Sequence, residues 1–246
     1  MTVRPIDGQP TAIGANFLGI VYPWDDLFTQ LSAGLAGPPI QLQIVRHAQS
    51  VANARGLIAG QSDVELSLRG YFQAFALGFR LQQRYDIACV SYLGRAYRTL
   101  QIAQAVRLQG SSRPPIYVDA RLNERALGDL EGTPHRPISA YAAGDLTYAP
   151  NKGESYLDLA RRLLSFLVDL RVSVQRESRV VIATHIGPMR LLVGIIEGYD
   201  DPRSVLSLKF GNAHTYGCVL RELTWPAFIR KGVLFERHRQ KVGAAN

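Results

Sequence analysis

From residue 41 onward, short apolar runs alternate with longer segments of helical periodicity, and this alternation restricts the fold more than any other feature of the sequence. Five runs have the length and composition of buried strands: Leu42–Val45, Ile87–Tyr92, Ile116–Val118, Arg179–Thr184 and Tyr216–Leu220. Strands that alternate with helices form mainly parallel sheets with helices on both faces. The sequence therefore predicts an α/β fold, a three-layer sandwich around a mainly parallel central sheet.

Two of the predicted helices carry apolar stripes. The first stripe consists of four residues on one helix face: Leu68, Phe72, Phe75 and Phe79. The second, longer stripe consists of Tyr156, Leu159, Leu163, Leu167, Leu170 and Val174. Ser67 is the predicted N-cap of the first helix, while Ser155 and Asp158 approximate a capping box at the start of the second. Apolar stripes on helices of globular proteins normally face the core.

Residues 1–40 differ from the rest because they are rich in Gly and Pro and weakly periodic, apart from a predicted short helix around Trp24–Leu35. We interpret them as an N-terminal extension packed on a single domain of residues 41–246. The apolar stretch 11–22 is interrupted by Asn16 and lacks a small-residue cleavage site, so we interpret it as part of the soluble protein and not as a secretory signal.

The formal net charge is +8, from 28 basic and 20 acidic residues. Such a charge suits an anionic partner, which could be nucleic acid, a membrane surface or a small phosphate compound. No stretch reaches the ~20 apolar residues of a membrane helix, so no membrane partner is predicted. Cys89 and Cys218 show no CxxC spacing, which favours a reducing compartment and a cytoplasmic location, although a bridge between them stays open.

Three predicted strands lead into basic residues at their carboxyl ends. The first runs into Arg46 and His47, the second passes through Ser91 to Arg95 at a helix start, and a later one runs into His185. In sheets of this kind, ligands bind at the carboxyl ends of the strands. We therefore expect these side chains to converge at one edge of the sheet.

Glu124 follows the 116–118 strand in a loop-like segment. Each of these polar residues has an ordinary interpretation when taken alone. A lone Arg is usually a surface ion pair, a lone His is usually a core or surface group, and Glu124 could form a salt bridge with Arg121 or Arg125. Their joint occurrence at strand ends favours a functional site.

Five segments, in order, carry a family resemblance: "RHAQSVAN" (46–53), "DVELSLRGYFQA" (63–74), "SYLGRAYRT" (91–99), "LNERALGDLEG" (122–132) and "ATHIG" (183–187). Together they resemble the histidine phosphatase superfamily, which includes the cofactor-dependent phosphoglycerate mutases. The resemblance covers about residues 41–222. It implies that residues 41–246 form a catalytic domain that transfers phosphoryl groups through a phosphohistidine.

This chemistry needs a neutral nucleophile and several fixed donors for the phosphoryl oxygens. Imidazole is largely uncharged near neutral pH, so we predict His47 as the nucleophile. Arg46 and Arg95 would supply planar guanidinium groups, and His185 a donor that is stronger when protonated. By resemblance, Asn53 adds an uncharged donor to the same phosphate pocket.

Glu124 resembles the family's general acid/base, which protonates the leaving alkoxide and later accepts a proton from water. Two histidines and a glutamate could also bind a metal, but two neighbouring arginines would repel a cation and no HxH or HExxH spacing occurs. We therefore predict no metal and no dissociable cofactor.

We interpret Glu131 and Gly132 as a turn. The remaining histidines are interpreted as surface or loop groups: His135, His214 and His238.

Two residues depart from the family pattern. Ala48 replaces the usual Gly after Arg-His, which would strain a turn that needs positive φ and is harmless otherwise. Ile186 replaces a common Gly after the second histidine and adds bulk beside the phosphate site, while its backbone N–H stays available. Neither change removes a charged or nucleophilic group.

The segment 132–155 is short and offers only Arg136 and Lys152 as cations, which favours a phosphatase over a mutase. The prediction is a phosphomonoester hydrolase acting on a small phosphorylated metabolite. A phosphoglycerate mutase-type phosphotransferase and a non-catalytic phosphate-binding module are the alternatives. No nucleic-acid partner is predicted because no recognition motif occurs, and a homodimer is kept open.

Overall fold

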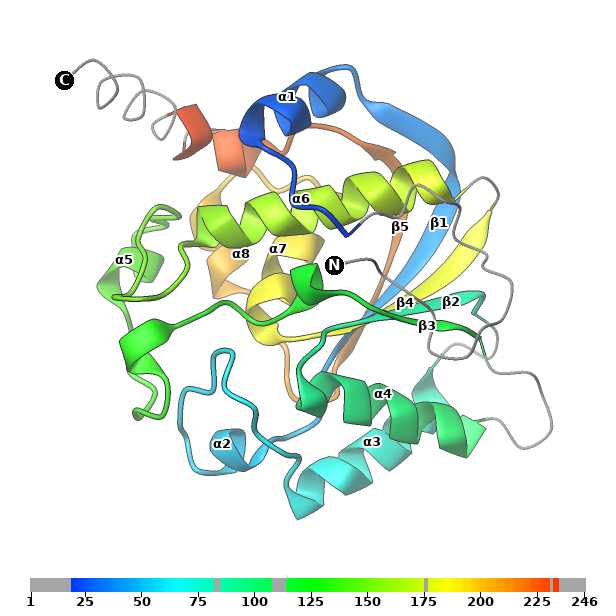
Figure 1. The fold of residues 1–246 in the computed structure, drawn as a ribbon, viewed down its shortest axis with the longest axis vertical. Coiled ribbons are helices and arrows are strands. Elements are labelled where there is room, and N and C mark those ends of the chain that lie inside the picture. Colours follow the sequence, from blue (N-terminus) through cyan, green and yellow to red (C-terminus); the bar gives the residue numbers. More distant parts are fainter. Residues whose placement is uncertain (1–18, 82–84, 108–113, 175–176, 231, 235–246) are drawn as a thin grey trace.

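The computed structural model describes residues 19–81, 85–107, 114–174, 177–230 and 232–234 (Figure 1). Within these residues, five strands form one sheet in the spatial order β3-β2-β4-β1-β5. The strands are β1 (Leu35–Arg46), β2 (Ile87–Val90), β3 (Ile116–Val118), β4 (Ser178–Thr184) and β5 (Thr215–Leu223). All neighbours pair in parallel except β5, which runs antiparallel to β1. The predicted α/β fold is confirmed.

The structure contains a strand at each of the five predicted positions, with different ends. β1 begins at Leu35 instead of Leu42, so the division drawn at residue 40 falls inside this strand. A register shift between Ala36 and Ile40 interrupts its pairing with β5, and Pro38 and Pro39 in that stretch hid the strand from a periodicity argument. The helix predicted around Trp24–Leu35 is α1, which ends at Ser32.

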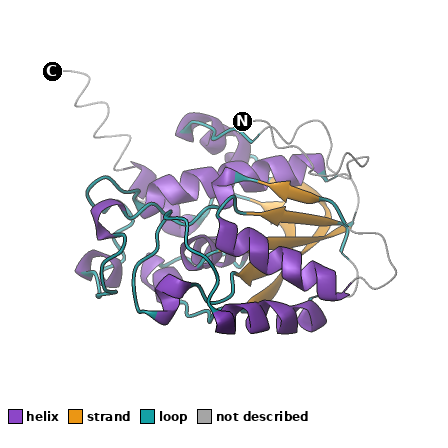
Figure 2. Cartoon of the chain, turned by 60° about the horizontal axis from the view of Figure 1, so that its bottom comes forward, coloured by secondary structure: helices purple, strands orange, loops and turns teal. Residues whose placement is uncertain are grey.

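Helices cover both faces of the sheet (Figure 2). They are α1 (Trp24–Ser32), α2 (Val51–Ala54), α3 (Leu68–Arg80), α4 (Gly94–Arg107), α5 (Ser139–Ala142), α6 (Tyr156–Ser173), α7 (Ile186–Ile196) and α8 (Pro202–Ser207). The larger core cluster joins one sheet face to α1, α6 and α7, and the smaller one joins the other face to α3 and α4. Because successive side chains of β1 point to opposite faces of the sheet, Ile44 belongs to the first cluster and Val45 to the second.

Side-chain caps start two of the helices as predicted. Ser67 Oγ accepts the backbone N–H of Gly70 at the start of α3. At the start of α6, Ser155 Oγ accepts the N–H of Asp158, and the Asp158 carboxylate accepts the N–H of Ser155. These bonds satisfy donors that have no partner within the helix.

The apolar stripe of α3 faces solvent, which reverses the usual orientation. Its exposed fractions run from 52% for Phe75 to 76% for Leu68. The buried face of α3 consists of small residues and one leucine: Gly70, Ala74, Leu77 and Gly78. A Cβ on Gly70 would lie 2.1 Å from the carbonyl oxygen of Gln49. The small face therefore allows a close approach to the domain, and the large side chains are left outside.

Candidate active site

The pairing of β1 with β4 brings the two predicted site histidines together. Arg46 lies opposite Thr184 in the parallel register, so His47 and His185 follow at the same carboxyl edge. The backbone N–H of His47 donates to the carbonyl of Thr184, and the two imidazole centroids lie 5.0 Å apart. His47 and His185, which are far apart in sequence, therefore lie together at the carboxyl edge of the sheet, as their positions after two strands predicted.

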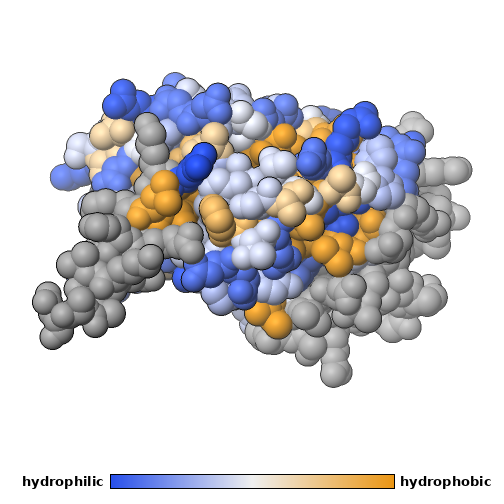
Figure 3. Space-filling model, turned by 90° about the horizontal axis from the view of Figure 1, so that it is seen from above, coloured by the Kyte–Doolittle hydropathy of each residue, from blue (hydrophilic) through white to orange (hydrophobic). Residues whose placement is uncertain are grey.

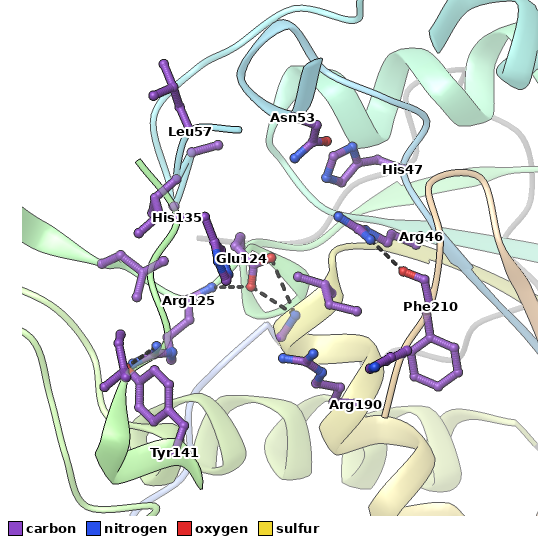
Figure 4. A pocket seen from close by; sticks show the side chains of 18 of the residues that line it. Arg46, His47, Asn53, Leu57, Glu124, Arg125, His135, Tyr141, Arg190 and Phe210 are labelled. Atoms are coloured by element: carbon purple, nitrogen blue, oxygen red, sulfur yellow. Dashed lines mark hydrogen bonds between the residues drawn. The ribbon is translucent and has the colours of Figure 1, made fainter. Parts of the chain in front are cut away.

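A cavity of about 600 Å³ opens at this edge (Figure 4). Five of the six predicted site residues line it: Arg46, His47, Asn53, Arg95 and Glu124. His185 is fully buried beside His47 and is not among the lining residues. The predicted set is therefore assembled in one place, with five members at the cavity wall and His185 buried next to the nucleophile candidate.

His47 is held in one tautomer. Its Nδ1 lies 2.6 Å from the carbonyl oxygen of Ala48. A carbonyl can only accept, so Nδ1 carries the proton and Nε2 keeps its lone pair. Burial lowers the pKa of His47 well below 6.5, and the positive charges of Arg95 and Arg46 lower this pKa further. The ring is therefore neutral over the physiological pH range, with a lone pair on Nε2.

Arg46 and Arg95 each keep one buried nitrogen unused. Arg95 donates Nη1 to the carbonyl of Ser62 and Nη2 to that of Gly60, and Arg46 donates Nη1 to the carbonyl of Phe210. The Nε atom of each guanidinium is buried and has no hydrogen-bond partner among the described residues. Burial is the first cause that lowers the pKa of each group. Buried donors without partners are costly and are expected where a ligand binds.

His185 is oriented by a chain of hydrogen bonds. Ser91 Oγ donates to Oδ1 of Asn123, which also accepts the N–H of Tyr92. Since the Ser91 hydroxyl has one proton, it can only accept from Nε2 of His185, 2.8 Å away. Nδ1 of His185 is then the buried, unpartnered atom. Burial and the charge of Arg95 lower the pKa of His185 well below 6.5, so Nδ1 bears a lone pair in the neutral ring and becomes a donor only on protonation.

Asn53 is positioned by a capping box and by a loop residue. The box links Ser50, the N-cap of α2, to Asn53 through reciprocal side-chain-to-backbone bonds. Asn212 Nδ2 also donates to Oδ1 of Asn53 at 3.0 Å. Because the amide oxygen accepts from two donors, the amide N–H groups are left for the cavity. Asn212 was not predicted, because nothing in a loop sequence indicates this contact across the site.

Glu124 binds backbone donors, not a cation. Its Oε1 accepts the N–H of Arg125 at 2.9 Å and that of Gly187 at 3.2 Å (Figure 4). Gly187 belongs to the first turn of α7, whose positive end favours a carboxylate. A Cβ on Gly187 would lie 2.4 Å from Oε1, so the close approach requires glycine. The carboxylate is thereby held at the cavity wall.

The two candidate salt-bridge partners of Glu124 are engaged elsewhere. Arg121 forms buried ion pairs with Asp119 and Asp169, each at 2.7 Å. Arg125 donates to the carbonyl of Glu154 and to the hydroxyl of Tyr141, and its guanidinium also lies over the Tyr156 ring.

A family model described as the histidine phosphatase superfamily (branch 1) matches residues 42–225. The chain belongs to the histidine phosphatase superfamily. The resemblance that the five sequence segments carried is therefore confirmed.

The proteins that this chain is similar to include both mutases and phosphatases. A 2,3-bisphosphoglycerate-dependent phosphoglycerate mutase of Bartonella tribocorum is 31% identical, with 65% of this chain and 82% of that protein covered. A glucosyl-3-phosphoglycerate phosphatase of Mycobacterium tuberculosis is 38% identical over 54% of this chain and 61% of its own length. The solved mycobacterial glucosyl-3-phosphoglycerate phosphatase with VO3 has a TM-score of 0.61 and 29% identity, over 72% of this chain and 90% of that chain. The names thus divide between mutases and phosphatases.

The two departures from the superfamily pattern are accommodated. Ala48 is not among the described residues with positive φ, and it is fully buried in a small apolar cluster. Its backbone N–H donates to Thr99 Oγ1, which in turn donates to the carbonyl of Arg95. Ile186 lines the cavity at the first position of α7. The extra methyl group of Ala48 therefore adds packing without backbone strain.

Glu131 does more than complete the predicted turn, which Gly132 does form with φ of 80°. Its carboxylate accepts the backbone N–H groups of Gln61, Ser62 and Leu127. Although burial opposes it, these bonds and the Ser62 hydroxyl lower the pKa of Glu131. The loop that it holds supplies the two carbonyls that bind Arg95. Glu131 is therefore a positioning residue for Arg95, a role that a local turn signal does not reveal.

The structure shows where two of the three remaining histidines lie. His135 is exposed but lines the cavity, so its interpretation as a simple loop group was incomplete. His214 is exposed and its ring packs near that of Phe210, with the ring centroids 5.4 Å apart, and His238 lies outside the described residues. Among the described residues, no group of three or more His, Cys, Asp or Glu side chains could hold a metal ion. Cys89 and Cys218 are both free. No described helix is long and apolar enough to cross a bilayer.

Proposed function

We propose that this protein hydrolyses phosphomonoesters through a phosphohistidine on His47. The main support is the state of His47, a neutral imidazole at the cavity wall whose Nε2 has a free lone pair. Beside it lie the guanidinium groups of Arg46 and Arg95, each with a buried Nε that has no hydrogen-bond partner among the described residues. Arg46, Arg95 and Asn53 would bind the phosphoryl oxygens, and His185 would donate Nδ1–H after it takes up a proton. A bound phosphate dianion would favour that protonation, because its negative charge stabilises the protonated ring.

The proposed reaction has two steps. Nε2 of His47 forms the N–P bond while the bond from phosphorus to the ester oxygen breaks, and protonated Glu124 gives its proton to the departing alkoxide. A water molecule then attacks phosphorus, Glu124 takes a proton from that water, and the N–P bond breaks to release inorganic phosphate. The structural support is the position of Glu124, held at the same cavity by the N–H groups of Arg125 and Gly187.

The partner that we propose is a small phosphorylated metabolite, with no nucleic acid, in the cytoplasm. The size of the cavity and the cations that line it support a small anionic substrate. A homodimer also remains a proposal. A non-catalytic phosphate-binding module is disfavoured, because binding alone needs neither a free nucleophile nor a carboxylate beside it.

Hydrolysis can be separated from mutase activity with phosphorylated enzyme. Of the two cations predicted in segment 132–155, Arg136 lines the cavity, whereas Lys152 pairs with Asp129 and is exposed. We therefore expect 32P-labelled phosphoenzyme mixed with 3-phosphoglycerate to release free phosphate faster than it forms bisphosphoglycerate or the isomer. Excess chelator should leave the rate unchanged. Faster isomer formation would assign a mutase, and activity restored by zinc or magnesium after chelation would overturn the metal-free mechanism.

The cavity is lined by cations other than Arg46 and Arg95, and these favour substrates that carry a second anionic group besides the phosphate. Arg190 and Lys209 also line the cavity, and Arg190 is close enough to lower the pKa of Arg46, after the larger effect of burial (Figure 4). Arg190 Nε donates to the carbonyl of Leu208, and no described acidic group forms a salt bridge with it. A carboxylate or second phosphate on the substrate would supply its partner.

We expect Arg190→Gln to raise the KM for 3-phosphoglycerate about ten-fold, the loss of one charged hydrogen bond. The KM for p-nitrophenyl phosphate, which has no second anion, should change less than about two-fold by the same estimate. Arg190→Lys should recover part of the loss, and Arg179→Gln at the far end of β4 serves as the control. Equal increases for both substrates would show that Arg190 only supports the backbone at Leu208.

A further inference from the structure

The exposed face of α3 carries large apolar side chains that the active site does not use. Leu68, Phe72, Phe75 and Phe79 are all at least half exposed, and Phe75 and Phe79 contact each other edge to face at 5.5 Å. None of the four lines the cavity. We call these four residues the α3 seam. Together they form one of the large contiguous apolar patches of a soluble protein surface, and such patches are often functional.

The spacing of the seam indicates what covers it. Its members follow one another at intervals of four, three and four residues, which is the a/d pattern of helices that pack along each other. The stripe is narrow, with Arg69 exposed on one side and Tyr71 on the other. A surface that binds a bilayer in its plane is normally a broad apolar face beneath a cation-rich polar face. The seam therefore fits another helix with the same spacing.

The charges around the seam also disfavour a membrane. Asp63 and Glu65 precede α3, while Arg69 and Arg80 lie within it, and all four are exposed. Their charges cancel, so this face lacks the positive excess that attracts anionic lipid. The side of the molecule that carries α1, which lies away from α3 in Figure 1, shows a mixture of hydrophilic and hydrophobic residues (Figure 3). The balanced charges around the seam therefore favour a protein partner over a bilayer surface.

We propose that the α3 seam is the interface of a homodimer in which the two α3 helices pack antiparallel about a two-fold axis. That arrangement places Phe72 of one copy against Phe75 of the second, and Leu68 against Phe79. Arg69 then lies at the rim of the interface, between Ala76 and Arg80 of the second copy, where both arginine side chains can extend into solvent. At about 200 Å² per aromatic side chain, the exposed seam has an area on the order of 500 Å² in each copy. Burial of both seams would therefore remove about 1,000 Å² in total, which is the lower limit for a specific interface.

Sedimentation velocity of the full chain over a concentration series tests this proposal. We expect a dimer for the wild type, and a dissociation constant raised at least ~100-fold by the double substitution Phe72→Asp and Phe75→Asp, because two aromatic contacts are lost and charges are buried. Leu234→Asp, which places the same charge at another exposed apolar residue, should leave the dimer intact. Phosphatase activity on p-nitrophenyl phosphate should survive in all three proteins and shows that each is folded.

Three results would overturn the proposal. The first is a wild-type chain that stays monomeric at every concentration, and the second is a dimer that the double substitution does not weaken. The third is a monomer that sediments with vesicles of phosphatidylserine and phosphatidylcholine and loses this binding on the double substitution. In that case a bilayer surface, and not a second copy, would be the occupant of the seam.

Discussion

Replacing His47 by alanine should abolish phosphohistidine formation and reduce turnover of every phosphomonoester by at least roughly 10⁴-fold, the scale of removing a nucleophile. Alanine leaves the two guanidinium groups and Glu124 in place, so phosphate binding should persist while the N–P bond cannot form. Trapping with 32P-labelled substrate, followed by alkaline gel analysis that preserves phosphohistidine, measures the intermediate directly. His135→Ala, which removes another imidazole from the same cavity, should still form the phosphoenzyme.

The pH dependence gives an independent check on His47. The ring attacks only when neutral, so activity is present above its pKa and is lost as the pH falls through that value. Burial, Arg95 and Arg46 lower this pKa well below 6.5, so the acid limb of kcat/KM should lie well below pH 6.5. A phosphoenzyme in the alanine variant, or an acid limb at or above pH 6.5 that is traced to His47, would contradict the assignment.

Replacing Glu124 by glutamine should slow turnover by roughly 10²- to 10³-fold for alkyl phosphates and far less for p-nitrophenyl phosphate. An alkoxide is a poor leaving group and needs a proton as it departs, whereas p-nitrophenolate does not. Glutamine keeps the size of the side chain, and its amide oxygen can still accept the N–H groups of Arg125 and Gly187. The fold of the site should therefore persist.

The leaving-group series distinguishes the roles of Glu124. A plot of log kcat/KM against leaving-group pKa should steepen in the variant, because the proton no longer offsets the charge on the departing oxygen. Glu177→Gln, at an exposed residue just before the start of β4, is the matched control and should leave the plot unchanged. If all esters slow equally in the Glu124 variant, its role is structural or electrostatic and proton transfer is excluded.

The sequence does not reveal the residues that reach the site through contacts with distant parts of the chain. Asn212 holds Asn53, and Glu131 holds the loop whose carbonyls bind Arg95. Arg190 enters the cavity from α7. Each contact joins segments distant in the chain, and a side chain that meets such a partner has no local signal. The tautomer of His185 likewise depends on where Ser91 sends its single proton.

The sequence pattern predicts the order of strands and helices along the chain and places His47 and His185 at one edge of the sheet, whereas their contact depends on the pairing of β1 with β4. Parallel strands share one carboxyl edge, so residues at their ends lie along that edge, and strand neighbours decide which of them meet. Which face of α3 is buried depends, in contrast, on how the helix packs against the rest of the domain. Periodicity reveals that one face is apolar, but Gly70 and its small neighbours permit the closer backbone approach, so the large stripe lies in solvent. Burial depends on the shape of the opposing surface, which a single helix sequence does not contain.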